Sequence, residues 1–71
     1  MKVSNSGVSE PGGEHFITFE ANYTERETLR RWLEVNCEDH WQMLEDEGHS
    51  PLCWVVFKSE VDFDVAYLRF V

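Results

Sequence analysis

The chain has 71 residues, with fourteen acidic and six basic side chains and a formal net charge of −8 at pH 7. A protein this acidic is repelled by phosphate backbones and by anionic lipid surfaces, so we expect neither direct nucleic-acid binding nor membrane binding. Hydrophobic residues make up 42% of the chain and aromatic residues 14%, which is too apolar for a disordered acidic tail. One small folded domain is therefore expected, and self-association as a homodimer would enlarge its marginal core.

The N-terminal segment, residues 1–13, is predicted to be a disordered leader because it holds three glycines, three serines and a proline. Lys2 is not followed by the apolar run of a signal peptide, and no stretch approaches the ~20 apolar residues of a membrane span. We therefore expect a cytoplasmic protein with reduced cysteines. Residues 14–71 are predicted to form a single α+β domain.

The first half of that domain reads as a strand followed by a helix. Residues 15–21 are rich in β-branched and aromatic side chains and end at an asparagine, which predicts a strand. Thr24 and Glu27 have the spacing of a capping box, so a helix is expected to begin at Thr24. Its end is open between a break near Asn36, followed by a short strand over 40–44, and a continuation to about residue 46; the break is favoured.

The second half begins with a charged, glycine- and proline-containing loop over 45–51. Residues 52–58 are almost continuously apolar and are predicted to form a central strand buried on both faces. Ser59 and Asp62 have capping-box spacing, which favours a short helix over 60–70, with a β-hairpin as the alternative. This β-α-β-β-α order predicts a small antiparallel sheet with one or two helices packed on one face, part of a ferredoxin-like split unit.

One set of side chains has metal-ligand chemistry: Cys37, His40, His49 and Cys53. Two thiolates and two imidazoles would form a tetrahedral zinc site. Their order lacks the paired spacing of zinc fingers, and both cysteines fall on apolar patterns where a buried thiol is ordinary packing. The prediction is therefore no metal and no cofactor, with a zinc-stabilised interaction module as an alternative.

Catalytic and base-stacking patterns are weak. Glu38, Asp39 and His40 would be the acid–base group of an enzyme, but consecutive side chains point in different directions. The sequence has no nucleophile elbow, phosphate loop or HExxH motif, so we expect no enzymatic activity. A sheet displaying Phe16, Trp54 and Phe57 would stack bases, but the basic frame is missing and core packing is the expected role of these rings.

The acidic side chains give the sharpest functional hypothesis. A stripe of carboxylates about as dense as the phosphates of a nucleic-acid strand would compete for the basic groove of a nucleic-acid-binding protein, whereas the alternative is a solvated face that keeps the protein soluble. The stripe would consist of Glu34, Glu38, Asp39, Glu45, Asp46 and Glu47. The predicted partner-binding residues are Glu38, Asp39, Glu45, Asp46 and Glu47.

The C-terminal half carries a family resemblance. The stretch from Phe57 to Phe70, with its acidic cap and its Leu68-Arg69-Phe70 ending, resembles the endings of many short orphan proteins of tailed bacteriophages. The preceding pairs Arg31-Trp32 and Asn36-Cys37 are similar to a pattern found in several of them. The resemblance implies no catalytic residues and no common activity.

What the resemblance does imply is a phage accessory protein in the cytoplasm of a host cell. Such a protein would modulate or inhibit a host protein that has a basic surface. The predicted function is therefore that of a small acidic, non-enzymatic binding protein. A small structural or assembly protein acting as a homo-oligomer is the alternative.

Overall fold

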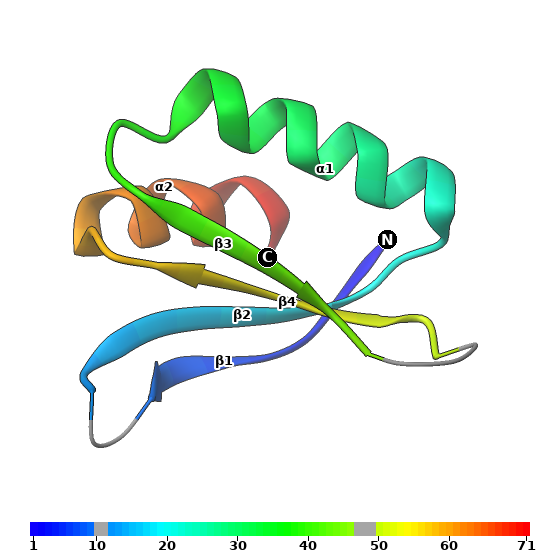
Figure 1. The fold of residues 1–71 in the computed structure, drawn as a ribbon, viewed down its shortest axis with the longest axis horizontal. Helices are drawn as coiled ribbons and strands as arrows, with labels where there is room; N and C mark the ends of the chain where they lie inside the picture. Colours follow the sequence, from blue (N-terminus) through cyan, green and yellow to red (C-terminus); the bar gives the residue numbers. More distant parts are fainter. Residues whose placement is uncertain (10–11, 47–49) are drawn as a thin grey trace.

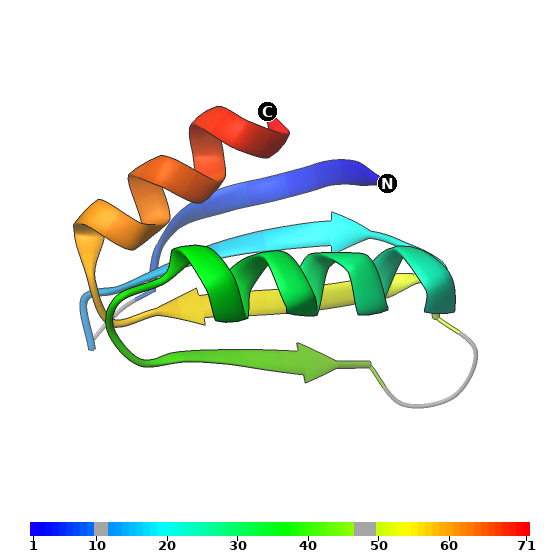
Figure 2. The same cartoon turned by 90° about the horizontal axis from the view of Figure 1, so that it is seen from above.

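The computed structural model describes residues 1–9, 12–46 and 50–71. Four strands form one antiparallel sheet in the order β1-β2-β4-β3, and both helices lie on the same side of it (Figures 1 and 2). The predicted α+β class, with helices on one face of a small antiparallel sheet, is confirmed. The elements are β1 (Lys2–Ser9), β2 (Glu14–Glu20), α1 (Tyr23–Asn36), β3 (Trp41–Glu45), β4 (Leu52–Phe57) and α2 (Glu60–Phe70).

The strand β1 corrects the prediction of a disordered leader over residues 1–13. It pairs with β2 from Lys2 opposite Glu20 to Ser9 opposite Glu14, with an irregularity between Val3 and Asn5. Composition argued for disorder because small and polar side chains bury little surface. Strand pairing, however, satisfies the backbone amides and carbonyls of β1 whatever its side chains are.

The N-cap of α1 lies two residues before the predicted cap. Asn22, not Thr24, is the N-cap: its side chain accepts from the Glu25 amide at 2.8 Å, and the Glu25 carboxylate accepts from the Asn22 amide at 3.0 Å. This pair is a capping box shifted by two positions, because β2 ends at Glu20 and the chain turns at once. The favoured break after Asn36 is confirmed, and β3 follows as the short strand.

The core lies between the sheet and the two helices. The sheet contributes Ile17 and Phe19 from β2 and Cys53, Val55 and Phe57 from β4, all fully buried, and they pack against Leu29 and Leu33 of α1 and Ala66 of α2. The prediction that β4 is buried on both faces is wrong, because its residues alternate between buried and half-buried. Both helices cover one side of the sheet only (Figure 1).

The favoured helix over residues 60–70 is confirmed as α2. Its N-cap is Ser59, whose hydroxyl accepts from the Asp62 amide at 3.4 Å. The aromatic residues of α2 serve the core: Phe70 packs edge-on against Phe19 with ring centroids 5.6 Å apart, and Phe63 does so against Phe57 at 6.0 Å. These contacts fix α2 above the central strands.

Candidate functional site

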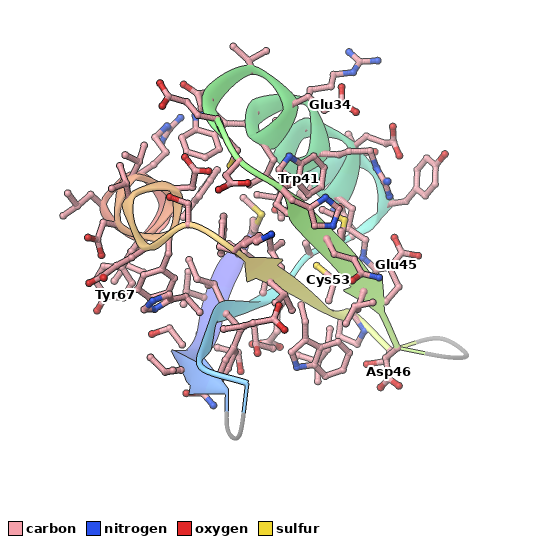
Figure 3. The ribbon with its side chains drawn as sticks, turned by 60° about the vertical axis from the view of Figure 1, so that its left-hand side comes forward. Glu34, Trp41, Glu45, Asp46, Cys53 and Tyr67 are labelled. Carbon is pink, nitrogen blue, oxygen red and sulfur yellow. The ribbon has the colours of Figure 1, made fainter. Side chains whose placement is uncertain are left out.

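The predicted partner-binding residues divide between the two ends of the edge strand β3. Glu38 and Asp39 lie in the connection before β3, whereas Glu45 is its last residue and Asp46 follows it. A strand rises about 3.3 Å per residue, so the two pairs are on the order of 15–20 Å apart. Figure 3 shows Trp41 at the start of β3, and Glu45 and Asp46 towards its other end. The fifth predicted residue, Glu47, lies outside the described residues.

The Glu38–Asp39 connection is held by a buried carboxylate. Asp62 is 4% exposed, and its two carboxylate oxygens accept hydrogen bonds from the Glu38 amide at 3.1 Å and the Asp39 amide at 2.9 Å. The sequence predicts Asp62 as the reciprocal half of a capping box with Ser59. In the fold, Asp62 instead joins the first turn of α2 to the chain between α1 and β3, and no sequence pattern marks this long-range role.

This anchored connection forms the centre of an acidic end of the molecule. We define the acidic end as Glu34 in the last turn of α1, Glu38 and Asp39 in the connection, and Glu60 in the first turn of α2. All four side chains belong to exposed residues. Within the described ranges, none of the four forms an ion pair with a lysine or an arginine. No direct ion pair within the described residues offsets these charges, and the Asp39 carboxylate accepts a hydrogen bond from the His40 amide at 2.7 Å.

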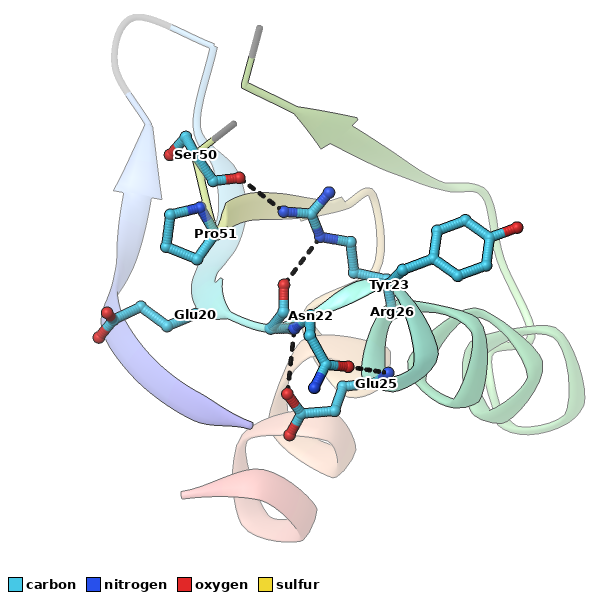
Figure 4. A pocket seen from close by; sticks show the side chains of 8 residues that line it. Glu20, Asn22, Tyr23, Glu25, Arg26, Ser50 and Pro51 are labelled. Carbon is cyan, nitrogen blue, oxygen red and sulfur yellow. Dashed lines mark hydrogen bonds between the residues drawn. The ribbon is translucent and has the colours of Figure 1, made fainter. Parts of the chain in front are cut away.

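The opposite end of β3 differs because basic side chains partly neutralise it. The Glu45 carboxylate lies 4.0 Å from the Arg26 guanidinium and 3.8 Å from that of Arg30. Arg26 is mainly structural: it donates to the Ala21 carbonyl at 3.0 Å and to the Ser50 carbonyl at 2.8 Å (Figure 4). Glu45 is therefore less available to an outside partner than Glu38 or Asp39.

A hollow of about 480 Å³ lies beside Arg26, between the start of α1 and the chain that enters β4 (Figure 4). Three of its polar side chains are already engaged, since Arg26 donates to two carbonyls and Asn22 and Glu25 cap the helix. These contacts account for Asn22, Glu25 and Arg26 as supports of the fold.

The three described residues of the zinc alternative lie on separate elements. Cys53 is fully buried in the core strand β4, His40 is exposed beside the far end of β4, where its carbonyl accepts from the Lys58 amide at 3.1 Å, and Cys37 is the C-cap of α1. His49 lies outside the described residues. Over the ranges that the structure describes, no three His, Cys, Asp or Glu side chains are grouped to hold a metal ion.

Both thiols are held in their neutral form. Burial, and secondly the charge of Asp62, raise the pKa of Cys37 to about 11. Burial also raises the pKa of Cys53, with smaller opposing effects of Arg26, which lowers it, and Glu45, which raises it. Since the thiolate is the nucleophile and the metal ligand, neither cysteine is activated at neutral pH.

The sheet face opposite the helices is the second notable surface. We define the open face by its apolar residues Phe16 on β2, Leu44 on β3, and Leu52, Trp54 and Val56 on β4, all of them half-buried or exposed. A groove of about 420 Å³ crosses it, lined by Glu14, Phe16, Gln42, Leu44, Trp54 and Val56. The expected core role of the aromatic rings is confirmed for Phe57, which is fully buried, and is wrong for Phe16 and Trp54, which are half-buried on the open face.

Comparison with protein-family models, with curated proteins and with solved structures finds no match. Neither helix of the described chain is long and apolar enough to cross a membrane.

Proposed function

We propose that this chain is a small non-catalytic binding protein that docks its acidic end on a basic surface of another protein. The observation that carries the proposal is the buried Asp62 carboxylate, which holds the backbone of Glu38 and Asp39 against the first turn of α2. A loop fixed in this way has little backbone conformational entropy left to lose when a partner binds its carboxylates.

The arrangement of charge at the acidic end also favours a partner. Glu34 lies in the last turn of α1, a turn without any basic residue, where the helix dipole disfavours a negative charge. Glu38, Asp39 and Glu60 then add like charges around one small surface. A basic partner would relieve this repulsion, and the field of a chain with net charge −8 would accelerate the encounter at low salt.

The resemblance of residues 57–70 to phage orphan proteins extends the proposal to a phage accessory protein that modulates or inhibits a host protein. Nucleic-acid mimicry is the form of inhibition that a fixed acidic surface suits best, because the partner's basic groove would then bind carboxylates in place of phosphates.

The first test is affinity capture from host-cell lysate at low and at high salt, followed by a binding titration with the purified partner. The Glu38→Gln/Asp39→Asn variant removes two charges from the acidic end and should weaken binding at least about tenfold. The control variant Glu20→Gln/Glu27→Gln removes the same charge elsewhere and should bind like the wild type. Equal effects of the two variants would overturn the assignment of the site, and mimicry further requires that nucleic acid compete for the partner.

A further inference from the structure

The open face is an apolar block bordered by charge at both ends of the strands. Pairing across the sheet places Phe16 opposite Val56, which is opposite Gln42, and in the next row Thr18 opposite Trp54, which is opposite Leu44. The ring of Phe16 lies against Gly7 of β1, where an added Cβ would be 3.6 Å from it. The apolar block therefore covers β2, β4 and β3 and reaches β1 only at Gly7.

The charged residues at the ends of the block follow from the same register. At one end His15 is opposite Phe57, so that Glu14 on β2 and Lys58 after β4 are the next positions, and both are exposed. At the other end Lys2 is opposite Glu20, and Asp46 donates its amide to the Leu52 carbonyl at 3.5 Å. Each end thus carries both signs of charge on different strands.

We propose that the open face is the interface of a homodimer, in which two sheets stack about a two-fold axis parallel to the strands and between β2 and β4. This axis lays β2 of one copy over β4 of the other, so that Glu14 faces Lys58 of the second copy, and the reverse contact occurs as well. Phe16 then faces Val56 of the second copy, within the groove. Over the outer strands, Lys2 of β1 faces Asp46 beyond β3 of the second copy.

Charge complementarity selects this axis over the other two-fold axis of a face-to-face pair. An axis perpendicular to the strands would lay β2 over β2 and place Glu14 against Glu20, two like charges. Stacked sheets cross at about 30°, a rotation that displaces the end rows by about one strand spacing. The long side chain of Lys58 can follow that displacement.

The size of the open face sets the strength of the dimer. Four strands spaced about 4.8 Å apart and about seven residues long span about 19 Å by 24 Å, so two copies cover on the order of 900 Å². This area is below that of stable, specific interfaces and in the range of weak, transient ones, and the apolar residues cover only part of it. A reversible dimer with micromolar affinity is therefore expected.

Sedimentation equilibrium of the full chain tests the proposal through a charge swap. Glu14→Lys and Lys58→Glu each set like charges against one another in the dimer, so each variant alone should dimerise at least about tenfold more weakly than the wild type. In an equimolar mixture, Lys at position 14 of one variant faces Glu at position 58 of the other, and Glu14 faces Lys58, so the mixture should recover wild-type affinity. A wild-type monomer at millimolar concentration, or a mixture as weak as its components, would overturn the proposal.

A second pair of variants tests the apolar block. Val56→Arg places a charge in the groove and should abolish the dimer, whereas Leu68→Arg on α2 should leave it intact, because Leu68 is 81% exposed on the helical side. Retention of the dimer in Val56→Arg would refute this interface. Since none of these positions belongs to the acidic end, failure here leaves the proposed basic-surface partner unaffected.

Discussion

The clearest prediction concerns the buried Asp62 carboxylate, which joins α2 to the connection between α1 and β3. Asp62→Ala removes the acceptor of two backbone hydrogen bonds, from Glu38 at 3.1 Å and from Asp39 at 2.9 Å. A hydrogen bond to a charged group contributes roughly 1.5–3 kcal/mol. Water can reach the exposed connection and solvate the freed amides, so we expect a net loss of about 2–4 kcal/mol.

This loss is large for so small a domain. A chain of 71 residues has a free energy of unfolding of roughly 4–10 kcal/mol. The expected change therefore removes a large fraction of the stability and lowers Tm by about 10–20 °C. Urea denaturation followed by circular dichroism measures the free energy of unfolding, and a thermal scan of the same variant measures Tm.

Asp64→Ala is the matched control, because Asp64 is an exposed carboxylate on the same helix two residues further along. We expect it to change the free energy of unfolding by less than about 0.5 kcal/mol. Asp62→Asn keeps one acceptor oxygen and should be intermediate. If Asp62→Ala and Asp64→Ala were equally stable, the carboxylate would not anchor the connection, and the reasoning for a fixed acidic end would fail with it.

Three further predictions follow from local contacts. Asn22→Ala should lower the free energy of unfolding, measured by urea denaturation, by about 1 kcal/mol, because Asn22 caps α1. Thr24→Ala should change it by almost nothing. Equal losses in the two variants would contradict the assignment of Asn22 as the cap. The pKa of Glu25 is lowered from its usual 4.5, first by hydrogen bonding to the Asn22 backbone and next by the contact with the N-terminal amino group. The Glu25 carboxylate therefore stabilises the fold above pH 4.5, and this stabilisation is lost as pH falls through the lowered pKa. In thermal scans at a series of pH values, Glu25→Gln should reduce the fall of Tm below pH 4.5. An unchanged fall of Tm would exclude Glu25 as its source. The pKa of Cys37 is raised from 9.0 to about 11, so its contribution to stability is fully present below pH 9 and is lost as pH rises towards 11. At pH 8, Cys37 should react with a disulfide reagent more slowly than a free thiol does. The buried Cys53 should react only when the protein unfolds. Rapid labelling of both in the native protein would refute this assignment.

Local sequence patterns were sufficient for most of the elements. The aromatic and β-branched segments gave β2 and β4, and the weak helix formers around Asn36 correctly ended α1. The leader was the main failure, because β1 is stabilised by pairing with β2 and that pairing depends on which segment lies beside it rather than on its own composition. The cap of α1 failed by two residues for a similar reason, since the end of β2 determines where the chain turns.

Of the candidate site, only the number of acidic residues and their positions along the chain could be predicted from the sequence. The sequence by itself determined the excess of carboxylates, the absence of a basic frame and the acidic residues on both sides of β3, because these are counts and positions along the chain. Only the tertiary structure decided that Arg26 and Arg30 offset the charge of Glu45, that Asp62 supports Glu38 and Asp39, and that one sheet face stays uncovered. Each of these outcomes joins residues far apart in the chain, and the energy of such a contact depends on the distance and burial that the whole fold sets, which no local pattern contains.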